Sequence, residues 1–184
     1  NPVLRAIPVI ATANDDQHCH AGIAPRGVFY GVKMNDKQTI LVLCTGNSCR
    51  SQMAEGLLRK FKGDRYRIES AGTDPKPEIH PLAIRAMQEI GIDLSGQRPK
   101  NASEFLGKAP IHHVLIVCDN ANGTCPTAWP GAMSRTFMPF DDPAHATGTE
   151  QEVLAVFRRV RDEIAVFAET WEPQPKPTKD LHRR

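Results

Sequence analysis

The chain has 184 residues, of which 40% are hydrophobic and 24% are charged, a composition typical of a globular protein that buries its own core. Its net charge of +2 is too small to indicate binding to nucleic acid or to a membrane surface. No apolar run approaches the roughly 18 residues of a membrane-spanning helix, so we expect no membrane span.

The ends of the chain differ in character from its middle. Residues 1–33 show no sustained periodicity, and Met34 stands just before the first strand pattern. We expect residues 1–33 to be an appended or upstream-translated extension, mostly disordered, residues 34–172 to form one domain, and residues 173–184 to be a flexible tail. The extension contains adjacent His18, Cys19 and His20, but three adjacent residues rarely converge on one metal ion.

Strand and helix patterns alternate along the domain. Strands are expected at residues 39–44, 66–70, 113–118 and 135–140, and helices at residues 51–61, 82–90 and 150–171, with a short helix near 103–106. The third strand is apolar enough to be central in a sheet. This order predicts an α/β fold: a single-domain three-layer sandwich whose four-stranded parallel sheet is flanked by helices.

The loop between the first strand and the first helix carries the chemistry. It begins with Cys44, ends with Arg50 and Ser51, and includes Thr45, Gly46, Asn47, Ser48 and Cys49. A loop that wraps into a helix N-terminus points backbone N–H groups inward, and the planar guanidinium matches two oxygens of a tetrahedral oxyanion. The sequence therefore predicts an oxyanion site; the alternative is a buried cysteine beside a surface arginine.

Cys44 is the expected nucleophile of this site. The same positive field favours its thiolate, and the Ser51 hydroxyl is placed to donate to its sulfur. Cys49 is expected to be buried and supportive. Since ligands of parallel sheets bind beyond the carboxyl ends of the strands, Cys118 and the pair Asp141-Asp142 are expected on the same rim as Cys44.

A second cysteine pair follows the third strand. Cys118 and Cys125 are separated by DNANGT, residues that favour turns, so a fold-back would bring them within disulfide range. Cys118 could also reach Cys44 on the neighbouring strand. A third possibility is that Cys118 and Cys125 are two unrelated buried cysteines. The chain has five cysteines in all, and an odd number suits thiol chemistry in a reducing, cytoplasmic location better than a secreted disulfide framework.

These motifs resemble a known family. Cys-(x)5-Arg-Ser directly after the first strand resembles the low-molecular-weight protein tyrosine phosphatase superfamily, and the string CTGNSCRSQMAEG is similar to its thioredoxin-coupled arsenate reductase branch. The resemblance extends from about Met34 to Trp171. It implies an enzyme that takes arsenate as substrate and thioredoxin as reductant. We expect this enzyme to be a monomer without a cofactor and, from its charge and the absence of a long apolar run, to contact neither nucleic acid nor membrane.

The resemblance also implies roles for individual residues. Cys44 matches the nucleophile, Cys118 the first resolving cysteine and Cys125 the final one, while Asp142, directly before a proline, matches the general acid. Asp141 is then a neighbouring structural or electrostatic partner. Under this reading Cys44 attacks arsenic, Cys118 attacks the Cys44 sulfur to release arsenite, and Cys125 resolves that disulfide.

Two other functions stay open. A tyrosine phosphatase needs only Cys44, Arg50 and Asp142, although Ala144 and His145 stand where the phosphatases of this superfamily usually have tyrosines. A non-catalytic oxyanion sensor would leave the complete nucleophile and acid set unexplained.

Some members of the superfamily bind potassium beside the loop. Asn47, Glu55 and Ser70 match three of its ligands, and the fourth position corresponds to Lys100. An ammonium group there is able to replace the ion, so we predict no bound metal.

Overall fold

The computed structural model describes residues 37–119 and 129–174. The extension 1–33, Cys125 and most of the tail lie outside the described residues. Within the described part, no helix is long and apolar enough to cross a membrane.

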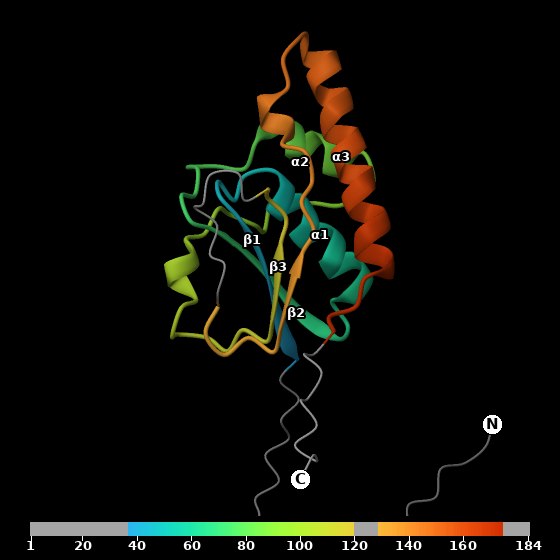
Figure 1. Cartoon of the computed structure of the whole chain (residues 1–184). Helices are drawn as coiled ribbons and strands as arrows, with labels where there is room; N and C mark the ends of the chain where they lie inside the picture. The colour runs from blue at the N-terminus through green and yellow to red at the C-terminus, as the bar shows by residue number, and fades with distance from the viewer. Residues whose placement is uncertain (1–36, 120–128, 175–184) are drawn as a thin grey trace, which may run out of the picture. The chain divides into compact units, whose positions relative to one another are not determined.

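A four-stranded parallel sheet forms the centre of the described domain (Figure 1). Its strands are β1 (Gln38–Cys44), β2 (Tyr66–Gly72), β3 (His113–Ile116) and β4 (Ser134–Phe137), in the spatial order β2-β1-β3-β4. The neighbours β1 and β3 run parallel with Ile40 opposite His113. This confirms the predicted α/β class, the parallel sheet and the interior place of the third strand.

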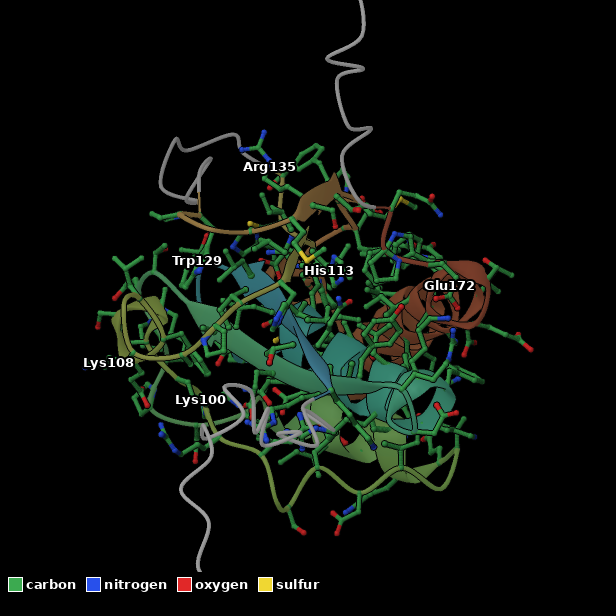
Figure 2. All side chains as sticks on the ribbon, turned by 90° about the horizontal axis from the view of Figure 1, so that it is seen from below. Lys100, Lys108, His113, Trp129, Arg135 and Glu172 are labelled. Carbon is green, nitrogen blue, oxygen red and sulfur yellow. The ribbon has the colours of Figure 1, made fainter. Side chains whose placement is uncertain are left out.

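Three helices accompany the sheet: α1 (Arg50–Lys62), α2 (Pro81–Gln88) and α3 (Glu150–Thr170). Helix α1 packs on β1, β2 and α3, and α2 packs on α3. Figures 1 and 2 place α1 and α3 on one face of the sheet, and the short turn η1 (Ala102–Glu104), close to the labelled Lys108, on the opposite side. A second short turn, η2 (Pro143–His145), follows β4.

The helix starts follow from local sequence. Thr149 caps α3 with a capping box, in which its side chain accepts from the N–H of Glu152 while that residue's side chain accepts from Thr149. His80 caps α2 through its ring nitrogen, and Pro81 follows at the first helical position. Helix α1 has no side-chain cap, because Cys49 occupies that position. Its N-terminus therefore opens on the loop that follows Cys44.

Several predicted boundaries shift by a few residues. Strand β4 ends at Phe137 rather than at residue 140, although Phe140 still donates its N–H to the Val117 carbonyl. Strand β3 ends at Ile116, two residues before Cys118. Helix α2 ends at Gln88, and the chain then turns through Gly91, whose φ of +73° favours glycine.

The core lies between β1 and the apolar faces of the helices. Ile40, Leu41, Val42 and Leu43 of β1 are fully buried. Helix α3 buries Leu154 and Ala168 in addition to Phe157, Val160 and Ile164, whereas Val153, Phe167 and Trp171 are only partly buried. The most buried line of α3 therefore runs from Leu154 to Ala168.

Candidate active site

The loop from Cys44 to Cys49 is held from outside by the segment that follows β2. The carbonyls of Cys44, Thr45, Gly46 and Ser48 accept from the N–H groups of Thr73, Asp74, Lys76 and His80 at 2.9–3.3 Å. Since the N–H on each such peptide plane points the opposite way from its carbonyl, the N–H groups of the loop face away from residues 73–80. The sequence analysis assigned no role to this Pro-rich segment; its position directly after β2, the neighbour of β1, was the available signal.

Asn47 fixes the loop from inside. It is fully buried and has a left-handed φ of 44°, which asparagine tolerates better than most residues. Its amide nitrogen donates to the hydroxyls of Ser51 at 2.9 Å and Ser70 at 2.8 Å, and its amide oxygen accepts from the N–H of Lys100 at 2.7 Å. The loop is thereby tied to α1, to β2 and to the connector before η1.

Gly72 allows β2 to approach the loop. A Cβ atom at this position would lie 2.3 Å from the carbonyl oxygen of Thr45, which is backbone and cannot give way cheaply. A Cβ atom at Gly46 would instead make an ordinary contact at 3.4 Å with the Lys76 side chain. The close approach that requires glycine is therefore at Gly72, a residue that the sequence analysis did not single out.

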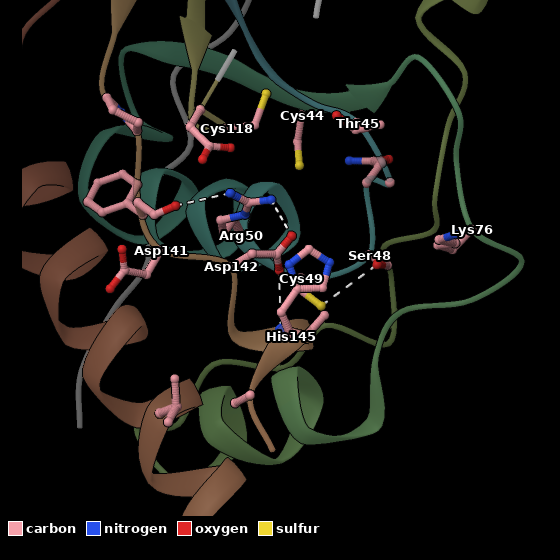
Figure 3. A pocket seen from close by; sticks show the side chains of 18 of the residues that line it. Cys44, Thr45, Ser48, Cys49, Arg50, Lys76, Cys118, Asp141, Asp142 and His145 are labelled. Atoms are coloured by element: carbon pink, nitrogen blue, oxygen red, sulfur yellow. Dashed lines mark hydrogen bonds and ion pairs between the residues drawn. The ribbon is translucent and has the colours of Figure 1, made fainter. Parts of the chain in front are cut away.

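Arg50 begins α1 and points its guanidinium into the site (Figure 3). The residue is only 5% exposed. Its Nη1 donates to the carbonyl of Phe140 at 3.0 Å, and its Nη2 donates to Oδ2 of Asp142 at 2.5 Å. Its Nε is buried and has no hydrogen-bond partner among the described residues.

The two aspartates after β4 face different surroundings. Asp142 caps η2, accepting from the N–H of Ala144 at 3.1 Å, and its side chain is 26% exposed. Asp141 is 73% exposed and pairs with Arg159 of α3 at 2.9 Å. Asp142 therefore contacts Arg50 within the site, whereas Asp141 is held by Arg159 of α3.

Cys44 and Cys118 are brought together, as their places on adjacent strands predict. Both are buried, and Figure 3 shows the two side chains beside each other at one side of the pocket. A hydrogen bond with Cys118 raises the pKa of the Cys44 thiol well above its usual range, and burial raises it further. Arg50 lowers this pKa but does not outweigh the other two causes.

The expectation of a Cys44 thiolate is therefore wrong for the site without substrate. The field of the loop is present, but a thiol neighbour and the loss of water favour the protonated form. The N–H of Asn47 donates to the Cys44 sulfur, a role that the sequence analysis gave to the Ser51 hydroxyl. That hydroxyl instead accepts from the side chain of Asn47.

Cys49 is a buried thiol, as expected. Its side chain lies 3.7 Å from the Ser48 hydroxyl, and burial raises the pKa of Cys49 to about 12. A group with this pKa stays protonated near neutral pH, so Cys49 is a poor second nucleophile.

The loop opens into a pocket of about 960 Å³ that contains every predicted site residue of the described part except Ser51. The pocket is also lined by ionisable residues of other segments: Asp74, Lys76, Asp119, His145 and Arg159. Figure 3 labels Lys76 and His145 among the side chains that line the pocket. These residues come from three loops and from α3, so no local pattern in the sequence could have assembled them. Among the described residues, no group of three or more His, Cys, Asp or Glu is arranged to hold a metal ion.

The four residues of the predicted cation position also meet. The hydroxyl of Ser70 donates to the carboxylate of Glu55, which is fully buried. The ammonium of Lys100 lies 3.3 Å from Oε2 of Glu55 and 3.1 Å from Oε2 of Glu69 (Figure 2 labels Lys100). A positive charge from the chain itself therefore stands beside the buried carboxylate.

Comparison with known proteins places this geometry in context. The chain is 49% identical over 140 residues to a protein of Halalkalibacterium halodurans named arsenate reductase, an alignment that covers 73% of this chain and 98% of the relative. It is 44% identical to an arsenate reductase of Bacillus subtilis, over 73% of this chain and 98% of that protein. A solved structure described as an arsenate reductase in the phosphate binding state is similar with a TM-score of 0.56 and 29% identity, over 72% of this chain and 94% of that one.

The family described as low molecular weight phosphotyrosine protein phosphatase matches residues 39–176, which include the Cys44 loop, Arg50, Cys118 and Asp142. The match spans most of the chain and all of the described helices and strands except the first residue of β1. The chain therefore belongs to the low molecular weight phosphotyrosine protein phosphatase family.

Proposed function

We propose that the chain is an arsenate reductase in which Cys44 attacks the substrate and Cys118 then attacks the Cys44 sulfur, so that a disulfide forms and arsenite is released. The observation that carries this proposal is the hydrogen bond between the thiols of Cys44 and Cys118, both of which line the oxyanion pocket. A hydrolase needs one nucleophilic cysteine there, whereas a reductase needs a second thiol within reach of the first. Relatives at 44–49% identity that are named arsenate reductases support the same substrate.

The first step joins arsenate to the enzyme. Loop N–H groups and Arg50 hold the dianion, and an oxygen of the dianion accepts the proton of the Cys44 thiol, whose raised pKa otherwise keeps it protonated. The Cys44 sulfur then bonds to arsenic while Asp142 protonates the departing oxygen, which leaves as water. The product is a covalent thiol–arsenate adduct.

The second step transfers the electrons. The Cys118 sulfur attacks the Cys44 sulfur while its proton passes to an oxygen of the departing arsenite; a disulfide forms, and the sulfur–arsenic bond breaks with its electron pair moving to arsenic. Arsenic(V) becomes arsenic(III), and arsenite leaves the pocket. The two thiols supply both electrons, so no metal or organic cofactor takes part in the step.

Recycling requires an external dithiol, which we propose to be thioredoxin. Cys125, which lies outside the described residues, attacks Cys118 and frees Cys44, leaving a Cys118–Cys125 disulfide for reduction. Because Cys118 is only 1% exposed, the chain around it has to rearrange before a protein reductant reaches it. We propose that the enzyme acts as a monomer in the cytoplasm, because the reducing environment there keeps these cysteines in the thiol form.

A second candidate function is that of a phosphatase for aryl phosphates. The combination of Cys44, Arg50 and Asp142 in one pocket supports it, because phosphate has the shape and charge of arsenate. It leaves the buried contact between Cys44 and Cys118 without a role. We therefore propose phosphatase activity as a side reaction.

A single-turnover experiment tests the proposal. The reduced chain is mixed with excess arsenate without any reductant, arsenite is quantified, and the disulfide is mapped by peptide mass spectrometry. We expect about one arsenite per chain, a disulfide that includes Cys118, no product from Cys44→Ser, and a Cys44–Cys118 disulfide trapped in Cys125→Ser. Arsenite formation by Cys118→Ser at the wild-type yield would contradict the assignment of Cys118.

A further inference from the structure

The guanidinium of Arg50 has one hydrogen-bond donor without an acceptor among the described residues. Of its three nitrogens, Nη1 donates to the Phe140 carbonyl at 3.0 Å and Nη2 donates to Oδ2 of Asp142 at 2.5 Å, while Nε is buried without a partner among the described residues. Nη2 and Nε share one edge of the planar guanidinium, and this edge binds two oxygens of a carboxylate or tetrahedral oxyanion side by side. Asp142 therefore occupies half of the edge.

Asp142 is prevented from covering the other half. Its second oxygen, Oδ1, accepts from the N–H of Ala144 at 3.1 Å, because Asp142 is also the cap of η2. The carboxylate thus contacts Arg50 through one oxygen only. A buried donor that lacks an acceptor is unfavourable, so an oxygen atom that accepts from Nε would stabilise the substrate-free site.

We infer that the bound oxyanion takes the place of Asp142 on Arg50. A tetrahedral oxyanion supplies one oxygen to Nη2 and a second to Nε, and so satisfies both donors where Asp142 satisfies one. The Phe140 carbonyl keeps Nη1 and holds the guanidinium plane in position during the exchange. This inference rests on the proposed function, and it gives Asp142 a role before catalysis as the internal occupant of the oxyanion site.

The exchange has two consequences for the reaction. An anion that offers only one atom to Arg50, such as a halide, cannot replace Asp142 with any gain, so the site selects anions with two oxygens and high charge. The displaced carboxyl remains tied to the N–H of Ala144 in the same pocket. It is therefore released beside the newly bound oxyanion, where, after it takes up a proton from solvent, it is the proton donor that the proposed mechanism needs.

The test is the binding of inorganic phosphate, which has the shape of arsenate but is not reduced. Isothermal titration calorimetry with the full chain compares wild type, Asp142→Asn and Asp141→Asn. Asp142→Asn removes the negative charge that competes with phosphate for Arg50, so we expect phosphate to bind at least about tenfold more tightly. Asp141→Asn removes the same charge one residue away from an exposed position, and we expect a change of about twofold at most.

A second measurement follows Arg50 itself in the wild-type chain. The Nε–Hε signals of the arginines are recorded by NMR during phosphate titration, and Arg50 is assigned by its absence in Arg50→Lys. We expect the Arg50 signal to shift strongly on binding, as its Nε gains an acceptor.

Several results would overturn the inference. These are unchanged or weaker phosphate binding by Asp142→Asn, an equal gain in Asp141→Asn, or an Arg50 Nε signal that does not respond to bound phosphate. Any of them leaves the proposed function standing if wild type still binds phosphate. If no variant binds phosphate, the oxyanion site and the proposed function fail together.

Discussion

Replacing Lys100 by methionine tests how the buried carboxylate beside the loop is balanced. Glu55 is fully buried. After Lys100 is removed, the Glu55 carboxylate still accepts a hydrogen bond from the Ser70 hydroxyl and still pairs with the guanidinium of Arg59 at 2.5 Å. Breaking a buried ion pair by removing one partner costs about 3–5 kcal/mol. Because Arg59 remains, we expect a loss of roughly 2–3 kcal/mol, or a fall in Tm of about 6–9 °C for a domain of this size.

The vacated space should then accept a monovalent cation. We expect Tm of Lys100→Met to rise with potassium chloride but much less with choline chloride at equal ionic strength, since choline is too large to enter. At a potassium concentration of ten times its dissociation constant, binding would stabilise the folded variant by about 1.4 kcal/mol. The melting of wild type, in which the ammonium already fills the position, should not distinguish the two salts.

Lys108→Met is the matched control, since Lys108 is an exposed lysine of the same connector. Circular dichroism melts of wild type and both variants in each salt complete the experiment. A Lys100→Met variant as stable as Lys108→Met would show that Lys100 does not balance Glu55. A specific potassium effect on wild type would show that an ion, and not Lys100, occupies the position.

Three further predictions concern the thiols and the loop. Cys118→Ala removes the largest cause of the raised pKa of Cys44, so we expect that pKa to fall. Alkylation of Cys44 by iodoacetamide at neutral pH should then accelerate, tenfold for each unit by which the pKa falls. An unchanged alkylation rate would show that Cys118 does not raise the pKa of Cys44. Because folding raises the pKa of Cys49 from 9.0 to about 12, the folded state holds this proton more tightly than the unfolded state. Stability should therefore fall as pH rises above about 9, by up to about 1.4 kcal/mol per pH unit for this thiol, and urea unfolding of wild type and Cys49→Ala between pH 8 and 10 measures the difference. Gly72→Ala should push β2 away from the Thr45 carbonyl, weakening phosphate binding and costing about 2–3 kcal/mol, whereas Gly96→Ala, where a Cβ atom meets nothing within 4 Å, should be near neutral.

Much of the site was predictable because it depends on the ends of parallel strands. Cys44 and Cys118 follow neighbouring strands in the sheet, and Asp142 follows the next one, so the topology alone brings them to one rim. The apolar run of β1 and the amphipathic helix that begins after the loop of residues 45–49 also predicted the position of Arg50.

The parts that sequence reasoning missed depend on contacts between distant segments. The support of the loop carbonyls by residues 73–80 and the close approach of Gly72 arise only when β2 lies beside β1. The protonation of Cys44 was mispredicted because the positive field of a loop is a local property, whereas burial and the Cys118 thiol come from the assembled fold. The Arg50–Asp142 pair joins residues 92 positions apart, and no spacing rule anticipates it.

The central claim is that electrons reach arsenic through Cys44 and Cys118. Its most direct test is steady-state NADPH oxidation with arsenate, thioredoxin and thioredoxin reductase, for wild type and Cys118→Ser, beside hydrolysis of an aryl phosphate by the same samples. We predict arsenate-dependent NADPH oxidation in wild type, its loss in Cys118→Ser, and retention of any aryl phosphate hydrolysis in that variant. Arsenate-dependent NADPH oxidation by Cys118→Ser at the wild-type rate would contradict the account.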